Sequence, residues 1–301
     1  MFQNIILFSE LRGTILTSTN RALTGLARFT LLVALLAPSA FPRRSSSKRS
    51  GHAARVQTGL DVLEAEKFAP LRGKHIGLIT NHTGFDALGR SNIDLLARAA
   101  GLQLVALFSP EHGLAGRANE NVASSKDPTT GLSIYSLYGD ARRPTDEMLQ
   151  GVDALVFDIQ DAGVRFYTYT VTMAYCMEEA AKRQIPFFVL DRPNPLGGEI
   201  VEGPMLDPDK TSFVAYFPIP VRYGLTIGEL AQFFNAENHI GAELHVIETS
   251  SADHSKHEAR NAAEAGKTAV QRDALYRVVR EYGRSVADSA APPSATTAAT
   301  R

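Results

Sequence analysis

The clearest pattern in the sequence is a series of short, uninterrupted apolar runs, each followed directly by polar residues. The runs span residues 76–79, 104–108, 154–157 and 187–190. Runs without polar alternation are typical of strands that are covered on both faces of a parallel sheet. Stretches with helical spacing lie between them, so strand and helix alternate along the chain. The pattern predicts an α/β doubly wound domain, a mainly parallel, Rossmann-like sheet with helices on both faces.

Helix starts are marked by capping-box patterns, in which Ser or Thr is followed three residues later by an acidic residue. The pattern occurs at Thr58, Ser91 and Thr226. Helices are also predicted over 145–150 and 170–183 from the spacing of their apolar residues.

A last strand is predicted at 245–247. The segments 110–133 and 191–225 show neither period and are predicted to be irregular. Loops of this length in a compact domain are commonly functional.

Polar side chains gather where the predicted strands end. Asn81 and His82 follow the first strand, and Glu111 and His112 follow the second. The third and fourth strands are followed by a larger set: Asp158, Gln160, Asp161, Arg165, Tyr167, Asp191, Arg192 and Asn194. Because parallel strands end at one edge of the sheet, and ligands bind beyond that edge, the pattern predicts the functional site there.

The two ends of the chain differ from the body in composition. The apolar run 29–37 follows Arg21 and Arg28 and precedes small residues, as in a secretory signal peptide. It is too short to span a bilayer comfortably, so we expect a secreted or periplasmic protein of the cell envelope without a membrane span in its mature form. The predicted organisation is a leader and basic linker at 1–55, a catalytic domain at 56–250, a helix within 251–286 and a disordered tail at 287–301.

Charge and cysteine content exclude several classes of function. Residues 1–55 hold eight Lys or Arg and one acidic residue, whereas the whole chain has a net charge of −1, so the body is acidic. Nucleic-acid binding by the body is therefore not expected. Cys176 is the single cysteine, which excludes an internal disulfide, and its helical context indicates a core residue. No Gly-x-Gly-x-x-Gly or P-loop motif follows a strand, and no cofactor is predicted.

Carboxylates are the chemical groups that these loops supply best. Hydrolysis of a glycosidic bond needs one acid to protonate the leaving oxygen and a second group to supply water or a nucleophile. Glu111 is the candidate acid because apolar neighbours would desolvate it, and Asp158 and Asp161 are candidates for the second role. Each has a structural alternative: Glu111 could pair with Arg117, and Asp158 could cap the loop after its strand.

Two other kinds of hydrolase are less well supported. His82 and His112 could bind a metal together with Glu111 or Asp158, but their spacing matches no known ligand pattern, and no metal is predicted. A serine nucleophile would need a Gly-x-Ser-x-Gly turn, which the sequence lacks.

Six long stretches resemble the exo-β-N-acetylmuramidases of peptidoglycan recycling, long catalogued as a domain of unknown function. They are GLITNHTGFD, LFSPEHGLAG, LYGDARRPTDEML, FDIQDAGVRFYTYTVTM, LDRPNPLGGEIVEGP and PIPVRYGLTIGELAQFFN. The similarity runs from Gly59 to Ile247 in consistent order. It implies a glycosidase that releases N-acetylmuramic acid from the non-reducing ends of cell-wall fragments, with a muropeptide or cell-wall disaccharide as substrate. It also implies a Rossmann-like domain accompanied by a smaller second domain.

The resemblance also implies roles for individual residues. Glu111 of the Ser-Pro-Glu-His-Gly stretch is the expected catalytic residue, and the stretches around Asn81, Asp158 and Asp191 are expected to line the cleft. Arg165 or Arg192 could bind the lactyl carboxylate of the sugar through two hydrogen bonds. Beyond residue 247 the sequence shows none of the family's second domain. A truncated paralogue that binds the sugar without turnover is therefore the alternative, besides the metal-dependent hydrolase.

Overall fold

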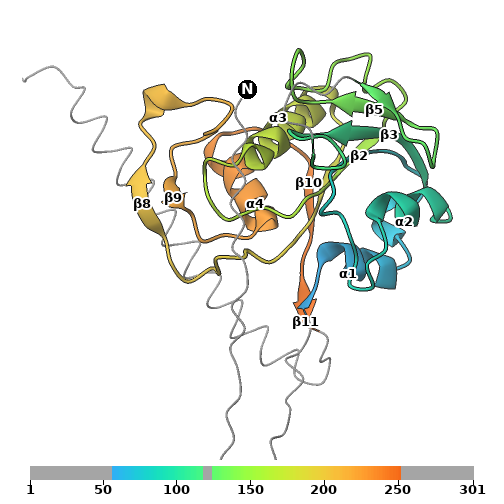
Figure 1. The fold of residues 1–301 in the computed structure, drawn as a ribbon, viewed down its shortest axis with the longest axis horizontal. Helices are drawn as coiled ribbons and strands as arrows, with labels where there is room; N and C mark the ends of the chain where they lie inside the picture. The colour runs from blue at the N-terminus through green and yellow to red at the C-terminus, as the bar shows by residue number, and fades with distance from the viewer. Residues whose placement is uncertain (1–55, 118–123, 252–301) are drawn as a thin grey trace, which may run out of the picture. The chain divides into compact units, whose positions relative to one another are not determined.

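The computed structural model describes residues 56–117 and 124–251 (Figure 1). The predictions made for residues 1–55, and those for the helix and tail beyond residue 251, lie outside these residues. Within the described part, no helix combines the length and the apolar character needed to cross a membrane.

A seven-stranded sheet forms the centre of the domain, in the order β10-β7-β6-β2-β3-β5-β4. Six of its strands run parallel to their neighbours. These are β2 (His75–Thr80), β3 (Gln103–Ser109), β5 (Ser133–Ser136), β6 (Ala154–Asp158), β7 (Phe187–Leu190) and β10 (Leu244–Ile247). The edge strand β4 (Ser125–Lys126) pairs antiparallel with β5. The predicted mainly parallel sheet is confirmed, and the five predicted strands match β2, β3, β6, β7 and β10.

The sequence did not predict β5. Its four residues alternate between half-buried and buried, because successive side chains point to opposite faces of the sheet. A four-residue run with two serines carries too little apolar signal to be recognised as a strand.

Four α-helices cover the sheet: α1 (Gly59–Ala65), α2 (Asn92–Arg98), α3 (Thr168–Arg183) and α4 (Ile227–Glu237). The predicted capping boxes form at Thr58 and Thr226: each threonine side chain accepts a hydrogen bond from the backbone N–H of the acid three residues on, and the side chain of that acid accepts one from the threonine N–H. Ser91 caps α2 through the backbone N–H of Ile93, at 3.2 Å, without a return bond.

The helix predicted over 145–150 is wrong, because this segment forms hydrogen-bonded turns. A single helical bond joins the N–H of Leu149 to the carbonyl of Thr145, at 3.1 Å. Gly151 then takes a left-handed conformation with φ +76°, which ends the turn before a second helical bond can form.

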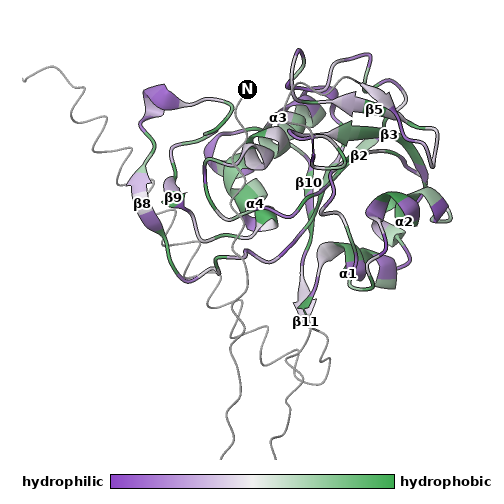
Figure 2. Cartoon of the chain, in the orientation of Figure 1, coloured by the Kyte–Doolittle hydropathy of each residue, from purple (hydrophilic) through white to green (hydrophobic). Residues whose placement is uncertain are grey.

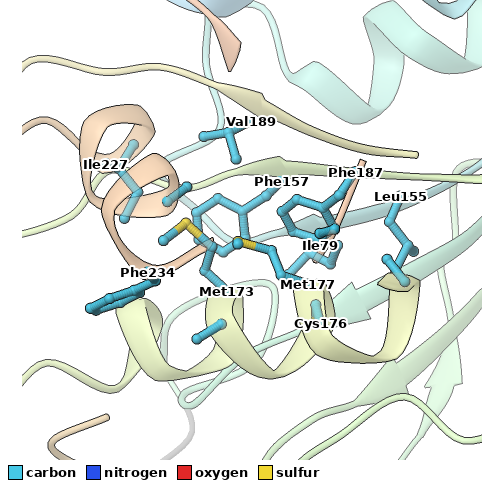
Figure 3. Close-up of a cluster of buried hydrophobic side chains, with 14 of the residues drawn as sticks. Ile79, Leu155, Phe157, Met173, Cys176, Met177, Phe187, Val189, Ile227 and Phe234 are labelled. Atoms are coloured by element: carbon cyan, nitrogen blue, oxygen red, sulfur yellow. The ribbon is translucent and has the colours of Figure 1, made fainter. Parts of the chain in front are cut away.

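Two hydrophobic clusters lie on opposite faces of the sheet. One packs α3 and α4 against the strands, and the other packs α1 and α2. Figure 3 shows Met173, Cys176 and Met177 of α3 directed toward Phe157 and Phe187 of the sheet. Burial raises the pKa of the Cys176 thiol, in keeping with the predicted core role. In Figure 2, strand β3 and parts of helix α4 are green, the colour of hydrophobic residues.

The segment predicted to be irregular after β7 contains a second, two-stranded sheet. It consists of β8 (Glu202–Met205) and β9 (Pro220–Arg222), which pair antiparallel, with the 3₁₀ turn η2 (Pro208–Lys210) between them. A third small sheet pairs β1 (Val56–Gln57) with β11 (Ser250–Ser251), and the 3₁₀ turn η1 (Ala69–Leu71) follows α1.

The order of the six parallel strands places the functional edge. Numbered along the chain, they take the Rossmann order 3-2-1-4-5-6, in which the first and fourth strands are neighbours. Connections leave these two strands in opposite directions, which opens a crevice beyond their carboxyl ends. Here the two strands are β2 and β6, and their pairing ends at Thr80 and Asp158.

Candidate active site

Asp158 lies at this switch point and is fully buried in an ion pair. The Arg192 Nε donates to Asp158 Oδ1 at 2.7 Å, and its Nη2 donates to Oδ2 at 3.1 Å. The Asn92 amide donates to the same Oδ2 at 2.7 Å and to the Thr80 hydroxyl at 2.8 Å. Asp158 is 0% and Arg192 5% exposed, so both carboxylate oxygens and the guanidinium are engaged inside the protein. This network joins side chains from β2, α2, β6 and the loop after β7 at the switch point.

Glu111 has a different setting on the loop that follows β3. It is half-buried, and its Oε2 accepts a hydrogen bond from the Thr168 hydroxyl at 2.6 Å. The pKa of Tyr138 is raised, first by a side-chain hydrogen bond with Glu111 and then by the charge of Glu111. Burial raises the pKa of Tyr169, and the charge of Glu111 adds to this shift. Thr168 and Tyr138 are therefore the hydroxyl partners of this carboxylate, and Tyr169 lies close enough to sense its charge.

The alternative pairing of Glu111 with Arg117 does not occur: no ion pair joins them among residues 56–117 and 124–251. Asp158 and Glu111 thus differ in the kind of group that holds them. A guanidinium fixes the first, whereas a neutral hydroxyl orients the second.

The two histidines lie on neighbouring loops. His82 is exposed, and its ring lies so close to Gly116 that a side chain at residue 116 would overlap it. Gly116 has φ +66°, so glycine is required there for both reasons. His112 is half-buried, with a left-handed backbone at φ +69°. In the part of the chain that the structure describes, no three His, Cys, Asp or Glu side chains are grouped to hold a metal ion.

Asn81 and Gln160 connect two of the edge loops through Thr83. The Asn81 side-chain oxygen accepts hydrogen bonds from the N–H and hydroxyl of Thr83, at 2.9 and 2.6 Å. The Thr83 hydroxyl in turn accepts one from the Gln160 N–H at 2.9 Å. The Gln160 side chain donates to the carbonyl of Pro193 at 2.9 Å, which ties in the loop after β7.

Asp161 is buried beside a tyrosine. Its Oδ2 accepts hydrogen bonds from the Tyr223 hydroxyl and, at 2.7 Å, from the Gly163 N–H. Burial raises the pKa of Asp161 and of Tyr223. With 5% of its surface exposed, Asp161 would have to leave these partners before its carboxylate could reach a substrate.

Arg165 and Asn194 connect the edge loops to the β8–β9 sheet and to the segment between β9 and α4. Arg165 donates through Nη1 to the carbonyls of Pro204, at 2.9 Å, and Ile219, and desolvation lowers its pKa. The Asn194 amide donates to the carbonyl of Leu225 at 2.8 Å. These bonds stabilise the long excursion between β7 and α4.

Asp191 sits at the N-terminal end of α4. Its Oδ1 accepts a hydrogen bond from the Gly228 N–H at 2.8 Å. Burial raises the pKa of Asp191 to about 6, although its hydrogen bonds favour the charged form. A carboxylate in this position stabilises the helix through its free N–H groups and its dipole.

Apolar side chains stay exposed around the same edge. Phe85 follows β2, Phe166 and Tyr167 follow β6, and Leu196 follows β7, each with 43 to 55% of its surface exposed. The rings of Phe166 and Tyr167 have centroids 5.8 Å apart. Exposed aromatic rings bordering a polar edge offer a surface on which the apolar face of a sugar can stack.

Comparison with known proteins decides the family. The family described as exo-beta-N-acetylmuramidase NamZ, N-terminal, matches residues 76–264. The chain belongs to the NamZ family. It is 49% identical over 227 residues to the peptidoglycan beta-N-acetylmuramidase NamZ of Bacillus subtilis strain 168, a match that covers 75% of this chain and 54% of the relative. The resemblance found in the sequence is thereby confirmed.

Solved structures of DUF1343 family proteins from Bacteroides fragilis NCTC 9343 have the same fold. One is 47% identical with a TM-score of 0.62, and covers 66% of this chain and 51% of its own length. Another is 36% identical with a TM-score of 0.57, and the match covers 65% of this chain and 52% of the solved chain. The chain therefore spans about half the length of the relatives it matches.

The NamZ fold brings all the predicted site residues to one edge but gives them unequal access. Of the four predicted carboxylates there, Asp158, Asp161 and Asp191 are each at most 5% exposed. Glu111 alone among these four is not buried. The catalytic and substrate-binding roles assigned from the sequence stay predictions.

Three residues at this edge escaped the sequence reasoning: Asn92, Tyr138 and Thr168. Asn92 is the first residue of α2 and is 1% exposed, which is unusual for an asparagine at a helix start. Thr168 and Tyr138 lie within stretches that carry the family resemblance. Their positions in the sequence give no sign of a role at the site, because each contacts a residue far away in the chain. Thr168 is 57 residues from Glu111, and Tyr138 is 27 residues from it.

Proposed function

We propose that this chain is an exo-acting glycosidase that releases N-acetylmuramic acid from the non-reducing ends of peptidoglycan fragments. The single observation that carries the proposal is Glu111, a half-buried carboxylate at the switch-point edge whose oxygen is oriented by the Thr168 hydroxyl. The name of the Bacillus subtilis relative, a peptidoglycan beta-N-acetylmuramidase, supports the choice of substrate.

Glu111 acts in this proposal as the general acid. The proton leaves the Glu111 carboxyl for the glycosidic oxygen, and the bond from that oxygen to the anomeric carbon breaks with its electron pair staying on the departing sugar. A water molecule bonds to the anomeric carbon in its place and releases a proton to solvent. Glu111 is left as a carboxylate. An acid in this role must carry a proton before the reaction, which a neutral hydroxyl partner permits and a guanidinium partner would oppose.

The other edge residues prepare the site in this proposal. Asp158, Asp161 and Asp191 hold loops, since each is buried with hydrogen-bond partners. Arg165 and Arg192 also bind protein groups, so a lactyl carboxylate would have to displace those groups. Tyr167 and the neighbouring exposed ring of Phe166 supply the surface for sugar stacking. His82, on the loop after β2, adds an exposed polar group at the same edge.

The site of action in this proposal is the cell envelope, outside the cytoplasm. Its support is the signal-like apolar run at 29–37 and the location of the proposed substrate. Fractionation of cells that express the full chain with a C-terminal tag would test this part separately.

The direct test of the proposed function uses the purified full chain and the disaccharide in which N-acetylmuramic acid is joined to N-acetylglucosamine. Chromatography should show both monosaccharides accumulating at an equal rate, with and without a chelator. Sugar binding without release would favour the non-hydrolytic paralogue. Loss of release on chelation would instead favour a metal-dependent hydrolase.

A further inference from the structure

The N-terminal end of α3 meets Glu111 through an unusual cap. Tyr167, the residue before the helix, makes no side-chain capping bond. Thr168, the first helical residue, is 6% exposed and directs its hydroxyl outward from the helix to Glu111 Oε2 at 2.6 Å. A carboxylate from a loop 57 residues away therefore lies at the positive end of a 16-residue helix.

The short contact fixes the direction of the carboxyl group. A free glutamate rotates about three side-chain bonds, the last of which leads to its carboxyl group. A hydrogen bond to one oxygen from a buried threonine, which is stiff at its first side-chain torsion, restricts this rotation. Tyr138 approaches the same carboxylate from the loop after β5, so the group is held from two elements of the fold.

A hydroxyl also suits both states of an acid that gives up a proton. It can accept a hydrogen bond from the protonated carboxyl before transfer and donate one to the carboxylate afterwards. An arginine, as at Asp158, can only donate, and so would favour the charged form throughout.

We infer that Thr168 is a positioning residue, which orients the carboxyl group of Glu111 for transfer of its proton to the leaving sugar. This inference rests on the proposed function and deepens it. Misplacement of a reacting group by about 1 Å can lower the rate about a hundredfold, and loss of a hydrogen bond to a charged group acts on a similar scale.

The chain offers a matched test. Thr168→Val removes the hydroxyl but keeps the shape, whereas Thr168→Ser keeps the hydroxyl. Thr172→Val is the control, because Thr172 lies on the same helix, is 0% exposed and has no hydrogen-bond partner for its hydroxyl within the described residues. Each variant is assayed for kcat and KM on the disaccharide across pH, and its thermal unfolding is measured.

Thr168→Val should lower kcat roughly ten- to hundredfold with little change in KM, and should shift the limb of the pH–rate profile that reports the acid. Thr168→Ser should recover most of the rate, and Thr172→Val should match the unsubstituted chain. If Thr168→Val does not fold, Thr168→Ala replaces it. Equal rates in Thr168→Val and the unsubstituted chain, or no recovery in Thr168→Ser, would overturn the inference.

A readout independent of turnover separates this inference from the proposed function. Crystal structures of the chain and of Thr168→Val should show the Glu111 carboxyl turned away from the start of α3 in the variant. If the unsubstituted chain releases no sugar, the proposed function fails. The comparison of the two crystal structures would still test whether Thr168 orients the Glu111 carboxyl. An unmoved Glu111 in Thr168→Val would contradict it.

Discussion

Two carboxylates at this sheet edge, Asp158 and Glu111, are held in opposite ways. Asp158 has no exposed surface and binds Arg192 through both oxygens, with an added hydrogen bond from Asn92. Glu111 is half-buried and has hydroxyl partners in Thr168 and Tyr138. The first arrangement holds a carboxylate in a buried ion pair, and the second orients a carboxyl group through neutral hydroxyl partners. Residue type alone would have assigned both to catalysis.

The difference also explains how the edge is assembled. The Asp158 network joins β2, β6, α2 and the loop after β7, so the burial of this ion pair is part of the fold. Gly84 packs directly against it, because a side chain at residue 84 would overlap Asn92 and Thr80. Glu111, on the loop after β3, is added to this rigid base without contributing to it. Under the proposed function, stability and reactivity belong to different carboxylates at one edge.

The largest effect on stability is expected from Asp158→Asn. This change leaves the buried Arg192 without its charge partner, and breaking a buried ion pair costs roughly 3 to 5 kcal/mol. Chemical denaturation should show that loss in the free energy of unfolding. Asp153→Asn is the control, since Asp153 pairs with His75 at the surface, where both side chains are 48% exposed and the effect should be about 1 kcal/mol or less. A variant Asp158→Asn that is as stable as the control would remove Asp158 from its structural role.

A smaller, pH-dependent effect is expected from Asp191→Asn. Because burial raises the pKa of Asp191 from 3.8 to about 6, the folded state binds this proton more tightly than the unfolded state does. The contribution of Asp191 to stability is therefore greatest below pH 4 and falls as the pH rises to about 6. Relative to the unsubstituted chain, Asp191→Asn should gain about 2 to 3 kcal/mol between pH 4 and pH 7.

The measurement for Asp191 is the free energy of unfolding of both proteins by urea at several pH values. The difference between them should change across pH 4 to 6 and be constant above pH 7. A difference that is constant throughout would show that the Asp191 side chain titrates alike in the folded and unfolded states. It would leave Asp191 available for the substrate-binding role predicted from the sequence.

Most of the fold could be predicted from the sequence, because buried parallel strands and helix caps leave local signals. The apolar run at 154–157 and the capping boxes at Thr58 and Thr226 are of this kind. Strand β5 was missed, and the turn at 145–150 was wrongly predicted to be a helix. Each segment is too short for the spacing of its apolar residues to distinguish strand, helix and turn. The prediction that the site lies at one sheet edge also followed from the positions of the strand ends.

The division of labour within the site could not be predicted in this way. Whether an aspartate faces solvent or an arginine depends on residues far away in the sequence, as with Asp158 and Arg192, which are 34 residues apart. The partners of Glu111 are likewise set by the packing of α3 and of the loop after β5 against the loop after β3. Such contacts leave no periodic signal in the chain.

The central claim is that Glu111 donates the proton to the leaving sugar, and the most direct measurement is the dependence of Glu111→Gln on the leaving group. The variant keeps the shape and a hydrogen-bonding group but has no proton to transfer. Its kcat on the disaccharide should fall roughly 10²- to 10⁴-fold, with an unchanged unfolding midpoint. On a nitrophenyl glycoside of N-acetylmuramic acid the loss should be much smaller, because nitrophenolate departs with little protonation. Equal losses on the two substrates, or a fully active variant, would contradict the account.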